Sequence, residues 1–457
     1  MATEAIKKKL SESKGARWTA LIIVSFTMMW GYFLTDALSP LMTMLEDTMG
    51  WSSTEFGMFN WAYCWFNVFL FMLVFGGIIL DKMGVRFTGT LTCILMLAGA
   101  IIKYYAVEYI SPGPEAGTIF GMRTQVFVAC LGYAIFAVGT ENCGITVSKV
   151  ITKWFTGHEL ALAMGIQVAV ARVGTALAMA FSPMIVKHFS MSAPLLFSAV
   201  LLLIGFLAYL VFCKMDRQFD QEVTLQQDNS DDIFKVRDLK FIITNRGFWL
   251  IALLCLMFYS AVFPFMKYAA SLMENKYGVP PTLAGLIPTL IPFGNLIMTP
   301  IFGGIYDKKG KGATIMVIGS ILLILVHVLF ALPLLDYWWF AAFIMIILGV
   351  AFSLVPSAMW PSVPKIIPQK LLGSAYALIF WVQNIGLGFV PLLIGHILNK
   401  YCISGTRIVE GMEVTQYDYT LPMCIFAAFG VVALLLAMRL KAVDRQNGYG
   451  LEEPNIK

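Results

Sequence analysis

Long apolar segments separated by short polar loops dominate the hydrophobic pattern of this chain. Because a membrane-spanning helix needs about twenty largely apolar residues, the pattern predicts an all-α membrane protein with twelve transmembrane helices. The six spans expected in the first half run over Trp18–Met44, Thr54–Leu80, Phe87–Val107, Thr118–Ser148, Leu160–Val186 and Ala193–Phe212. The six expected in the second half run over Phe248–Met273, Thr282–Tyr306, Thr314–Leu335, Trp338–Val363, Leu371–Leu398 and Tyr419–Leu440.

The longest polar interval, Lys214–Asn245, divides the expected spans into two sixes. We therefore expect a six-helix bundle over residues 1–213, a cytoplasmic linker over 214–245 and a second six-helix bundle over 246–457. The composition of the linker favours a plain solvated tether with a short amphipathic helix near Ile233–Phe241.

A short motif occurs once in each half of the chain. The second expected span ends in "GGIILDKMGVR", and the eighth ends in "GGIYDKKGK". The matching residues are Gly77, Asp81 and Gly84 in the first copy and Gly303, Asp307 and Gly310 in the second. An internal repeat of this kind indicates that the two halves are pseudo-symmetric copies of one fold.

Composition narrows the function classes. The chain is 59 % hydrophobic and 13 % charged, as expected of an integral membrane protein. The net charge of +5 is too small and too scattered to indicate a nucleic-acid partner. The cysteines and histidines show no disulfide framework or metal spacing, and no phosphate-binding glycine loop or clustered nucleophile and base is present. We expect no enzyme activity, no cofactor and no metal site.

Basic residues gather in alternate loops, and acidic residues gather in the opposite ones. By the positive-inside rule both termini are expected to be cytoplasmic. The first apolar run is long enough to span and lacks a cleavage-like site, so we interpret it as a retained helix.

Two opposite charges occupy places that a membrane helix tolerates badly. Glu141 and Arg172 lie in the fourth and fifth expected spans, and the connection between these spans turns near Trp154–His158. At about 1.5 Å per residue both charges lie roughly 20 Å from that turn, at similar depth. A bare charge at mid-bilayer costs at least ~2.5 kcal/mol, so each must face the bundle interior or a watery cavity. We hypothesise that they line a substrate site, and the alternative is a structural ion pair.

Other polar or aromatic side chains are candidates for the same cavity. Asp36 lies within the first span, where a carboxylate suits a substrate or proton site, although hydrogen bonding to backbone or to a neighbouring helix explains it equally well. Further candidate substrate contacts are Tyr259, Trp381, Gln383 and Asn384, each of which is alternatively a helix-packing residue.

The repeated Gly-x-x-x-Asp-Lys-x-Gly motif resembles the loop motif of the major facilitator superfamily. That resemblance implies that the acidic residue caps a neighbouring helix and holds the cytoplasmic gate closed, a role that falls here to Asp81 and to Asp307. Arg86 keeps the basic end of the motif. A carboxylate near helix N-termini gains from the helix dipole, and the glycines permit a tight turn. Alternatively the motif is a folding and topology element.

A closer resemblance covers nearly the whole chain. The stretches "WFTGHELALAMGIQVAVARVGT", "SAVFPF", "AMWPSVPKIIPQKLLGSAYALIFWVQNIGLG" and "GYFLTDALSPLM" are similar to the lysosomal dipeptide transporter branch of that superfamily. The resemblance implies peptide cargo, with Glu141 and Arg172 at the positions that contact the two charged ends of a dipeptide. The chemistry agrees, because an ammonium pairs with a carboxylate and a carboxylate pairs with the two-pronged guanidinium.

The chain also departs from that branch. Tyr133 replaces an arginine, and Lys267 replaces a small residue; a cavity-facing Lys267 would favour acidic cargo, whereas a lysine near a helix end more often snorkels. No Asn-x-Ser/Thr sequon or N-terminal dileucine signal is present. A bacterial inner membrane, and hence a bacterial homologue, is therefore preferred over a eukaryotic plasma or organelle membrane.

These features predict a monomeric secondary active or facilitative transporter that moves dipeptides or other small peptides across a lipid bilayer by alternating access. Proton coupling is open, with Glu141 and Asp36 placed for it. One alternative is a carrier of another small organic ion, such as an organic acid, an amino acid or a drug-like compound. A second is a non-transporting membrane subunit or receptor.

Overall fold

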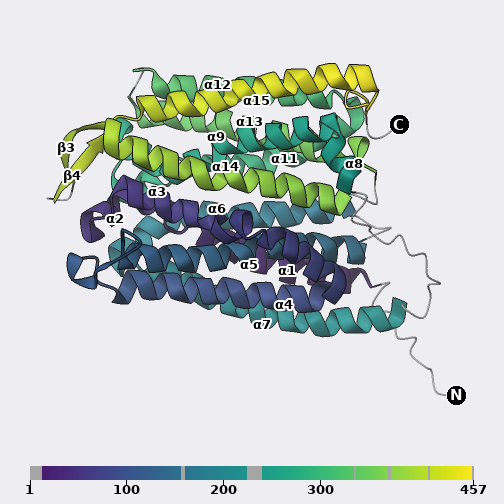
Figure 1. Ribbon diagram of the computed structural model, residues 1–457, viewed down its shortest axis with the longest axis horizontal. Coiled ribbons are helices and arrows are strands. Elements are labelled where there is room, and N and C mark those ends of the chain that lie inside the picture. Colours follow the sequence, from purple (N-terminus) through teal and green to yellow (C-terminus); the bar gives the residue numbers. More distant parts are fainter. Residues whose placement is uncertain are drawn as a thin grey trace.

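Long, nearly parallel helices make up the computed structural model (Figure 1). It describes residues 13–155, 160–223, 239–333, 336–368, 372–409 and 412–454. The β-hairpin formed by β3 and β4 lies at one end of the helices, and α8 with the last turns of α7 lies at the other (Figure 1). We call these the hairpin end and the linker end.

The first half of the chain forms one bundle. Its elements are α1 (Lys14–Asp36), the 3₁₀ helix η2 (Ser39–Leu41), α2 (Met42–Met49), α3 (Ser53–Trp61), the 3₁₀ turn η3 (Ala62–Cys64), the π-helical turn η4 (Trp65–Phe69), α4 (Met72–Tyr109), the 3₁₀ turn η5 (Pro114–Ala116), β1 (Thr118–Ile119), β2 (Met122–Arg123), α5 (Thr124–Phe155), α6 (Leu160–His188) and α7 (Ala193–Val223). Within this bundle α4 packs on α5, and α1 packs on α6 and α7.

The second half forms the other bundle. Its elements are α8 (Leu239–Thr244), α9 (Arg246–Tyr277), α10 (Pro281–Ala284), α11 (Leu290–Lys309), α12 (Gly312–Ala331), α13 (Trp338–Ile366), α14 (Leu372–Tyr401), β3 (Ile403–Val409), β4 (Met412–Tyr417) and α15 (Thr420–Asn447). Here α12 packs on α13 and α15, and α9 packs on α14 and α15. The strands β3 and β4 pair antiparallel.

The expected spans match the helices with two differences. Within the described residues ten helices are long and apolar enough to cross a membrane, and an eleventh candidate is a pair bent by 55° at the second expected span. The eighth expected span is divided into α10 and α11 by a turn over residues 285–289. The helix α11 keeps 20 residues and is about 30 Å long, but it is not one of these candidate spans.

The segment predicted as the linker is partly helical. The last turns of α7 continue to Val223, and α8 begins at Leu239. Most of the expected amphipathic helix, and the turn expected near Trp154–His158, involve residues outside the described ranges. The domain bounds therefore stay a prediction, whereas the two-bundle arrangement is confirmed.

The bundles approach each other closely toward the hairpin end, where α3 packs against α14. A Cβ atom added to Gly57 would lie 2.8 Å from the backbone oxygen of Pro391, so only glycine allows this spacing. The Ser53 hydroxyl donates to the backbone oxygen of Gly395 at 3.0 Å. Near the same end the Tyr417 hydroxyl in β4 donates to Glu46 of α2 at 3.0 Å. These contacts hold the two bundles together at the hairpin end.

Candidate substrate site between the two bundles

Glu141 lies near the middle of α5, at the boundary between the bundles. Its Oε1 atom accepts a hydrogen bond of 2.7 Å from the hydroxyl of Tyr63 in η3. The side-chain amide of Asn384, on α14 of the other bundle, lies near this carboxylate. Among the described residues no cation pairs with Glu141, so the carboxylate is held by neutral donors alone.

Arg172 lies near the middle of α6, and aromatic rings surround its guanidinium. The guanidinium carbon is 5.3 Å from the ring centroid of Tyr32, 5.1 Å from that of Phe263 and 5.3 Å from that of Phe352. Tyr32 belongs to α1, whereas Phe263 and Phe352 belong to α9 and α13 of the other bundle. Rings at these distances attract a cation through their π faces, and no described acidic residue forms an ion pair with Arg172.

Glu141 and Arg172 do not form an ion pair with each other in this conformation. The Tyr32 hydroxyl lies within electrostatic range of three charged side chains, those of Glu141, Arg172 and Asp36. The structure therefore does not show the ion pair that was the alternative explanation for the two buried charges. Among the described residues, neither Glu141 nor Arg172 has an oppositely charged side-chain partner.

Asp36 at the end of α1 pairs with Lys267 of α9, across the boundary between the bundles. The Lys267 Nζ atom is 2.7 Å from Asp36 Oδ1 and donates to the backbone oxygen of Thr35 at 2.9 Å. It also lies 3.5 Å from the hydroxyl of Tyr133, which donates to Thr35 O at 2.9 Å. Asp36 was explained above either as part of a substrate or proton site or as a group bonded to a neighbouring helix. Its main contact in this conformation, with Lys267, is of the second kind.

A third basic side chain, Lys103 of α4, lies beside this pair and is only 1 % exposed. Its Nζ atom donates to the backbone oxygen of Leu34 at 3.2 Å and lies 4.2 Å from the centroid of the Tyr133 ring. A basic side chain from the neighbouring helix α4 therefore contacts Tyr133, the residue that replaces the arginine. Lys267 is part of the same cluster and is 13 % exposed, so it neither snorkels to the interface nor stands free in a cavity.

The remaining predicted contacts divide into two groups. Tyr259 accepts a hydrogen bond from the Trp360 indole at 3.2 Å and belongs to the aromatic group around Arg172. Trp381 donates to the backbone oxygen of Val68 at 3.1 Å, which joins α14 to the first bundle. Gln383 instead accepts from the Cys255 thiol inside the second bundle, as a packing residue does.

Sequence reasoning missed the lining formed by Tyr32, Tyr63, Phe263, Phe352 and Lys103. The aromatic residues carry no signal of their own, because Phe, Trp and Tyr make up 14 % of this chain and are scattered through its spans. Lys103 could have been found from the sequence, because inserting a lysine within an apolar span costs about as much free energy as inserting Glu141 or Arg172.

At the linker end, the two copies of the repeated motif contain tight turns. Gly84 has a φ of 78° and Gly310 a φ of 69°, values that favour glycine. Gly77 and Gly303 lie within α4 and α11, where an added Cβ would meet no atom within 4 Å. The side chain of Asp81 lies outside what the structure describes, so the gating roles of Asp81 and Asp307 stay predictions.

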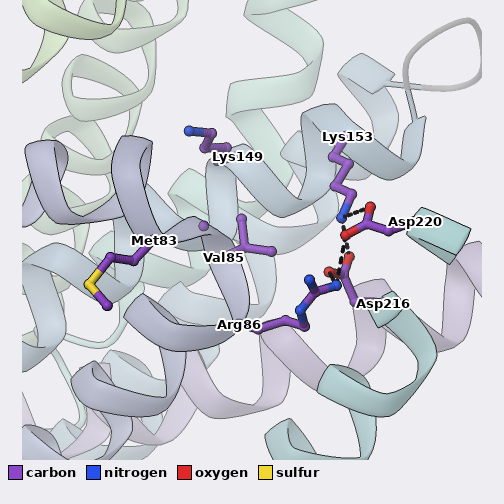
Figure 2. A pocket seen from close by; sticks show the side chains of 8 residues that line it. Met83, Val85, Arg86, Lys149, Lys153, Asp216 and Asp220 are labelled. Atoms are coloured by element: carbon purple, nitrogen blue, oxygen red, sulfur yellow. Dashed lines mark hydrogen bonds and ion pairs between the residues drawn. The ribbon is translucent and has the colours of Figure 1, made fainter. Parts of the chain in front are cut away.

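Arg86 forms the centre of a charged cluster between α4, α5 and α7 (Figure 2). Its Nη1 atom lies 3.1 Å from Asp216 and 2.7 Å from Asp220. Lys153 approaches the same carboxylates at 2.8 Å and 2.6 Å. The Trp154 indole also donates to Asp216 at 3.0 Å. The four charged side chains of the cluster border a hollow of about 250 Å³. The basic end of the motif thus ties α4 to α5 and α7.

We expect Asp216→Asn to destabilise the protein far more than Asp220→Asn. The Asp216 side chain is fully buried, so its loss leaves Arg86 and Lys153 poorly compensated and costs about 3 kcal/mol or more. Asp220 contacts the same two cations but is 39 % exposed, and its loss costs about 1 kcal/mol or less. Thermal unfolding in detergent measures both, and equal losses would contradict the distinction between the two carboxylates.

Two bundles of apolar helices that enclose buried charges define a polytopic membrane transporter. The family model "Major Facilitator Superfamily" matches residues 21–391. The chain belongs to the major facilitator superfamily.

Among curated proteins, the chain is similar to the "Lysosomal dipeptide transporter MFSD1" of several vertebrates. It is 25 % identical to the human protein over 395 residues, which cover 84 % of this chain and 80 % of the relative. The zebrafish protein is 26 % identical over 396 residues, which cover 84 % of this chain and 81 % of the relative.

Solved structures confirm the fold. The nucleoside transporter NupG superposes with a TM-score of 0.70 at 15 % identity, covering 92 % of this chain and 99 % of that one. A D-xylose-proton symporter gives a TM-score of 0.67 at 13 % identity, covering 93 % and 97 %.

Proposed function

We propose that this transporter carries dipeptides or other small zwitterionic peptides. The observation that supports the proposal most strongly is the pair of unneutralised charges, Glu141 and Arg172, between the two bundles. A dipeptide supplies both missing partners, because its ammonium pairs with the carboxylate and its carboxylate accepts two parallel N–H bonds from the guanidinium. The similarity to the vertebrate dipeptide transporters supports the same cargo.

The rings around Arg172 explain how cargo binding is coupled to the arrangement of the bundles. Tyr32 comes from the first bundle, whereas Phe263 and Phe352 come from the second. The site that would bind a cargo carboxylate at Arg172 is therefore formed by both bundles. It is complete only while the bundles lie close together. In alternating access the bundles rock about this central site. The contacts at the hairpin end make the present conformation the one closed there.

The proposed orientation puts the linker end in the cytoplasm. Arg86 of the first motif and Lys153 of α5 lie at that end, where they pair with Asp216 in the last turns of α7. We propose a monomer in the bacterial inner membrane. Glu141 and Asp36 are the two carboxylates placed for coupling to protons, and Asp36 bridges the bundles through Lys267. Uptake driven by an imposed proton gradient tests the coupling, and a gradient-insensitive rate removes it.

A small organic anion is the second candidate cargo. The guanidinium of Arg172 has no acidic partner among the described residues, which favours a ligand with a negatively charged group.

Thermal-shift measurements on the purified protein with dipeptides, single amino acids and organic acids separate the two candidates. We expect stabilisation by dipeptides. Stabilisation by organic acids or single amino acids alone would contradict the peptide proposal.

A further inference from the structure

The second span breaks beside the proposed cargo site. The chain passes from α3 through the 3₁₀ turn η3 and the π-helical turn η4 into α4, and Phe71 takes a left-handed φ of 54° at the break. Before the break, Tyr63 donates to Glu141 at 2.7 Å. After it, the side-chain amide of Asn142, the neighbour of Glu141, donates to the backbone oxygen of Met72 at 3.3 Å. The break therefore lies at the level of Glu141. Discontinuous helices of this kind are typical of substrate sites in transporters.

Asn67 lies within the π-helical turn of that break and is fully buried. Neither its amide nitrogen nor its amide oxygen has a hydrogen-bond partner in the described part of the chain. Buried amides are nearly always paired, because an unpaired one keeps the cost of its lost hydration. Asn67 follows Tyr63 by four residues, which puts the two side chains on a similar face of the broken helix.

A second incompletely paired amide, that of Asn384, lies opposite on α14. The two segments run antiparallel: Trp381 donates to Val68 O at 3.1 Å, and a Cβ added to Gly388 would lie 2.0 Å from the Cys64 sulfur. Asn384 lies between Trp381 and Gly388, just as Asn67 lies between Val68 and Cys64. Its amide nitrogen donates to Phe380 O at 2.9 Å, but its buried oxygen has no partner among the described residues.

We propose that Asn67 and Asn384 bind the peptide bond of the cargo. A peptide unit presents one N–H donor and one carbonyl acceptor, and the free Asn67 amide offers an acceptor and a donor in the matching arrangement. The unpaired amide oxygen of Asn384 accepts from the cargo's ammonium or peptide N–H. This inference rests on the proposed function and extends it from the charged ends of the cargo to the bond between them.

The two asparagines would make the carrier selective for peptides over other zwitterions of equal length. A site built to hydrogen-bond a ligand rejects an analogue that lacks the bonding group, because the buried polar groups of the site then stay unpaired. The matched ligands are diglycine and δ-aminovalerate, which have the same number of chain atoms between ammonium and carboxylate. Only diglycine has a peptide bond.

Titration calorimetry of the purified full chain with both ligands tests the inference. We expect the wild type to bind diglycine about a hundredfold more tightly than δ-aminovalerate. In Asn67→Leu the two affinities should come within about threefold of each other, through loss of diglycine binding alone. The unfolding temperature of the empty variant should stay the same or rise, because an unpaired buried amide has been removed. Asn67→Ala tests the same point should leucine disturb the packing.

Gln383→Leu is the matched control, since Gln383 is the neighbouring amide on α14 but bonds Cys255 inside the second bundle. It should leave the ratio of the two affinities unchanged. An unchanged ratio in Asn67→Leu, or equal wild-type affinities, would overturn the peptide-bond assignment while leaving the roles of Glu141 and Arg172 intact. A further outcome would also overturn the assignment: diglycine binds more tightly in sodium chloride than in choline chloride, and Asn67→Leu abolishes this difference. The amides would then bind a sodium ion and not the peptide bond. Failure of the wild type to bind either ligand would instead count against the proposed function itself.

Discussion

Replacing Arg172 by glutamine is expected to abolish the carrier's ability to distinguish a dipeptide from its C-terminal amide. The guanidinium lies among three rings without an acidic partner in the described residues, so the cargo carboxylate supplies its counter-charge. Removing one member of a desolvated, hydrogen-bonded charge pair costs about 2 to 5 kcal/mol of binding free energy. Titration calorimetry should therefore show a loss of dipeptide affinity of about thirtyfold or more, with little change for the amide.

Glu141→Gln provides the mirror-image control. It should remove the distinction between a free dipeptide and its N-acetylated form while keeping the distinction at the carboxyl end. Arg172→Lys keeps the charge but loses the planar fork, so its affinity should lie between those of the wild type and Arg172→Gln. If Arg172→Gln still preferred the free carboxylate over the amide, the guanidinium could not be the group that binds it.

Breaking the Asp36–Lys267 pair on one side only is expected to have the second large effect. Both side chains are largely buried, 11 % and 13 % exposed, and they join α1 to α9 across the bundle boundary. Removal of one partner leaves a buried uncompensated charge at a cost of about 3 to 5 kcal/mol. Lys267→Met and Asp36→Asn should each lower the unfolding temperature, and the double variant should recover most of the loss.

The same variants should open the hairpin end. A cysteine at position 53, in a background with Cys424 replaced by serine, should react faster with an impermeant maleimide in Lys267→Met than with Lys267 intact. Lys276→Met is the control, because Lys276 lies on the same helix but donates to Phe330 and Leu332 within its own bundle. Equal labelling rates in the two backgrounds would show that the Asp36–Lys267 pair does not hold the bundles together.

The fold was largely predictable because span length and loop charge are properties of the sequence alone. The break in the second span was not. The sequence around the break is apolar, and the residue whose backbone is left-handed is Phe71, where a glycine would be expected. The Trp381 indole, far away in the sequence, stacks on Phe71 and donates to Val68 O, so tertiary contacts stabilise the break.

Site residues were predictable from the sequence only where placing the side chain in a membrane has a high free-energy cost. That cost singled out Glu141 and Arg172, and the structure places both between the bundles. It singled out Asp36 too, but not its partner, because Lys267 lies 231 residues further along the chain. Asn67 gave no signal, since an asparagine in an apolar span costs much less than a charge, and only its unpaired buried amide draws attention to it.

Uptake of a radiolabelled dipeptide into proteoliposomes tests the central claim most directly. We predict saturable uptake that unlabelled dipeptide inhibits, and background uptake in liposomes that contain Glu141→Gln or Arg172→Gln protein of equal fold and amount. Wild-type uptake no greater than that of protein-free liposomes, with or without a proton gradient, would contradict the account, and so would full activity in both variants.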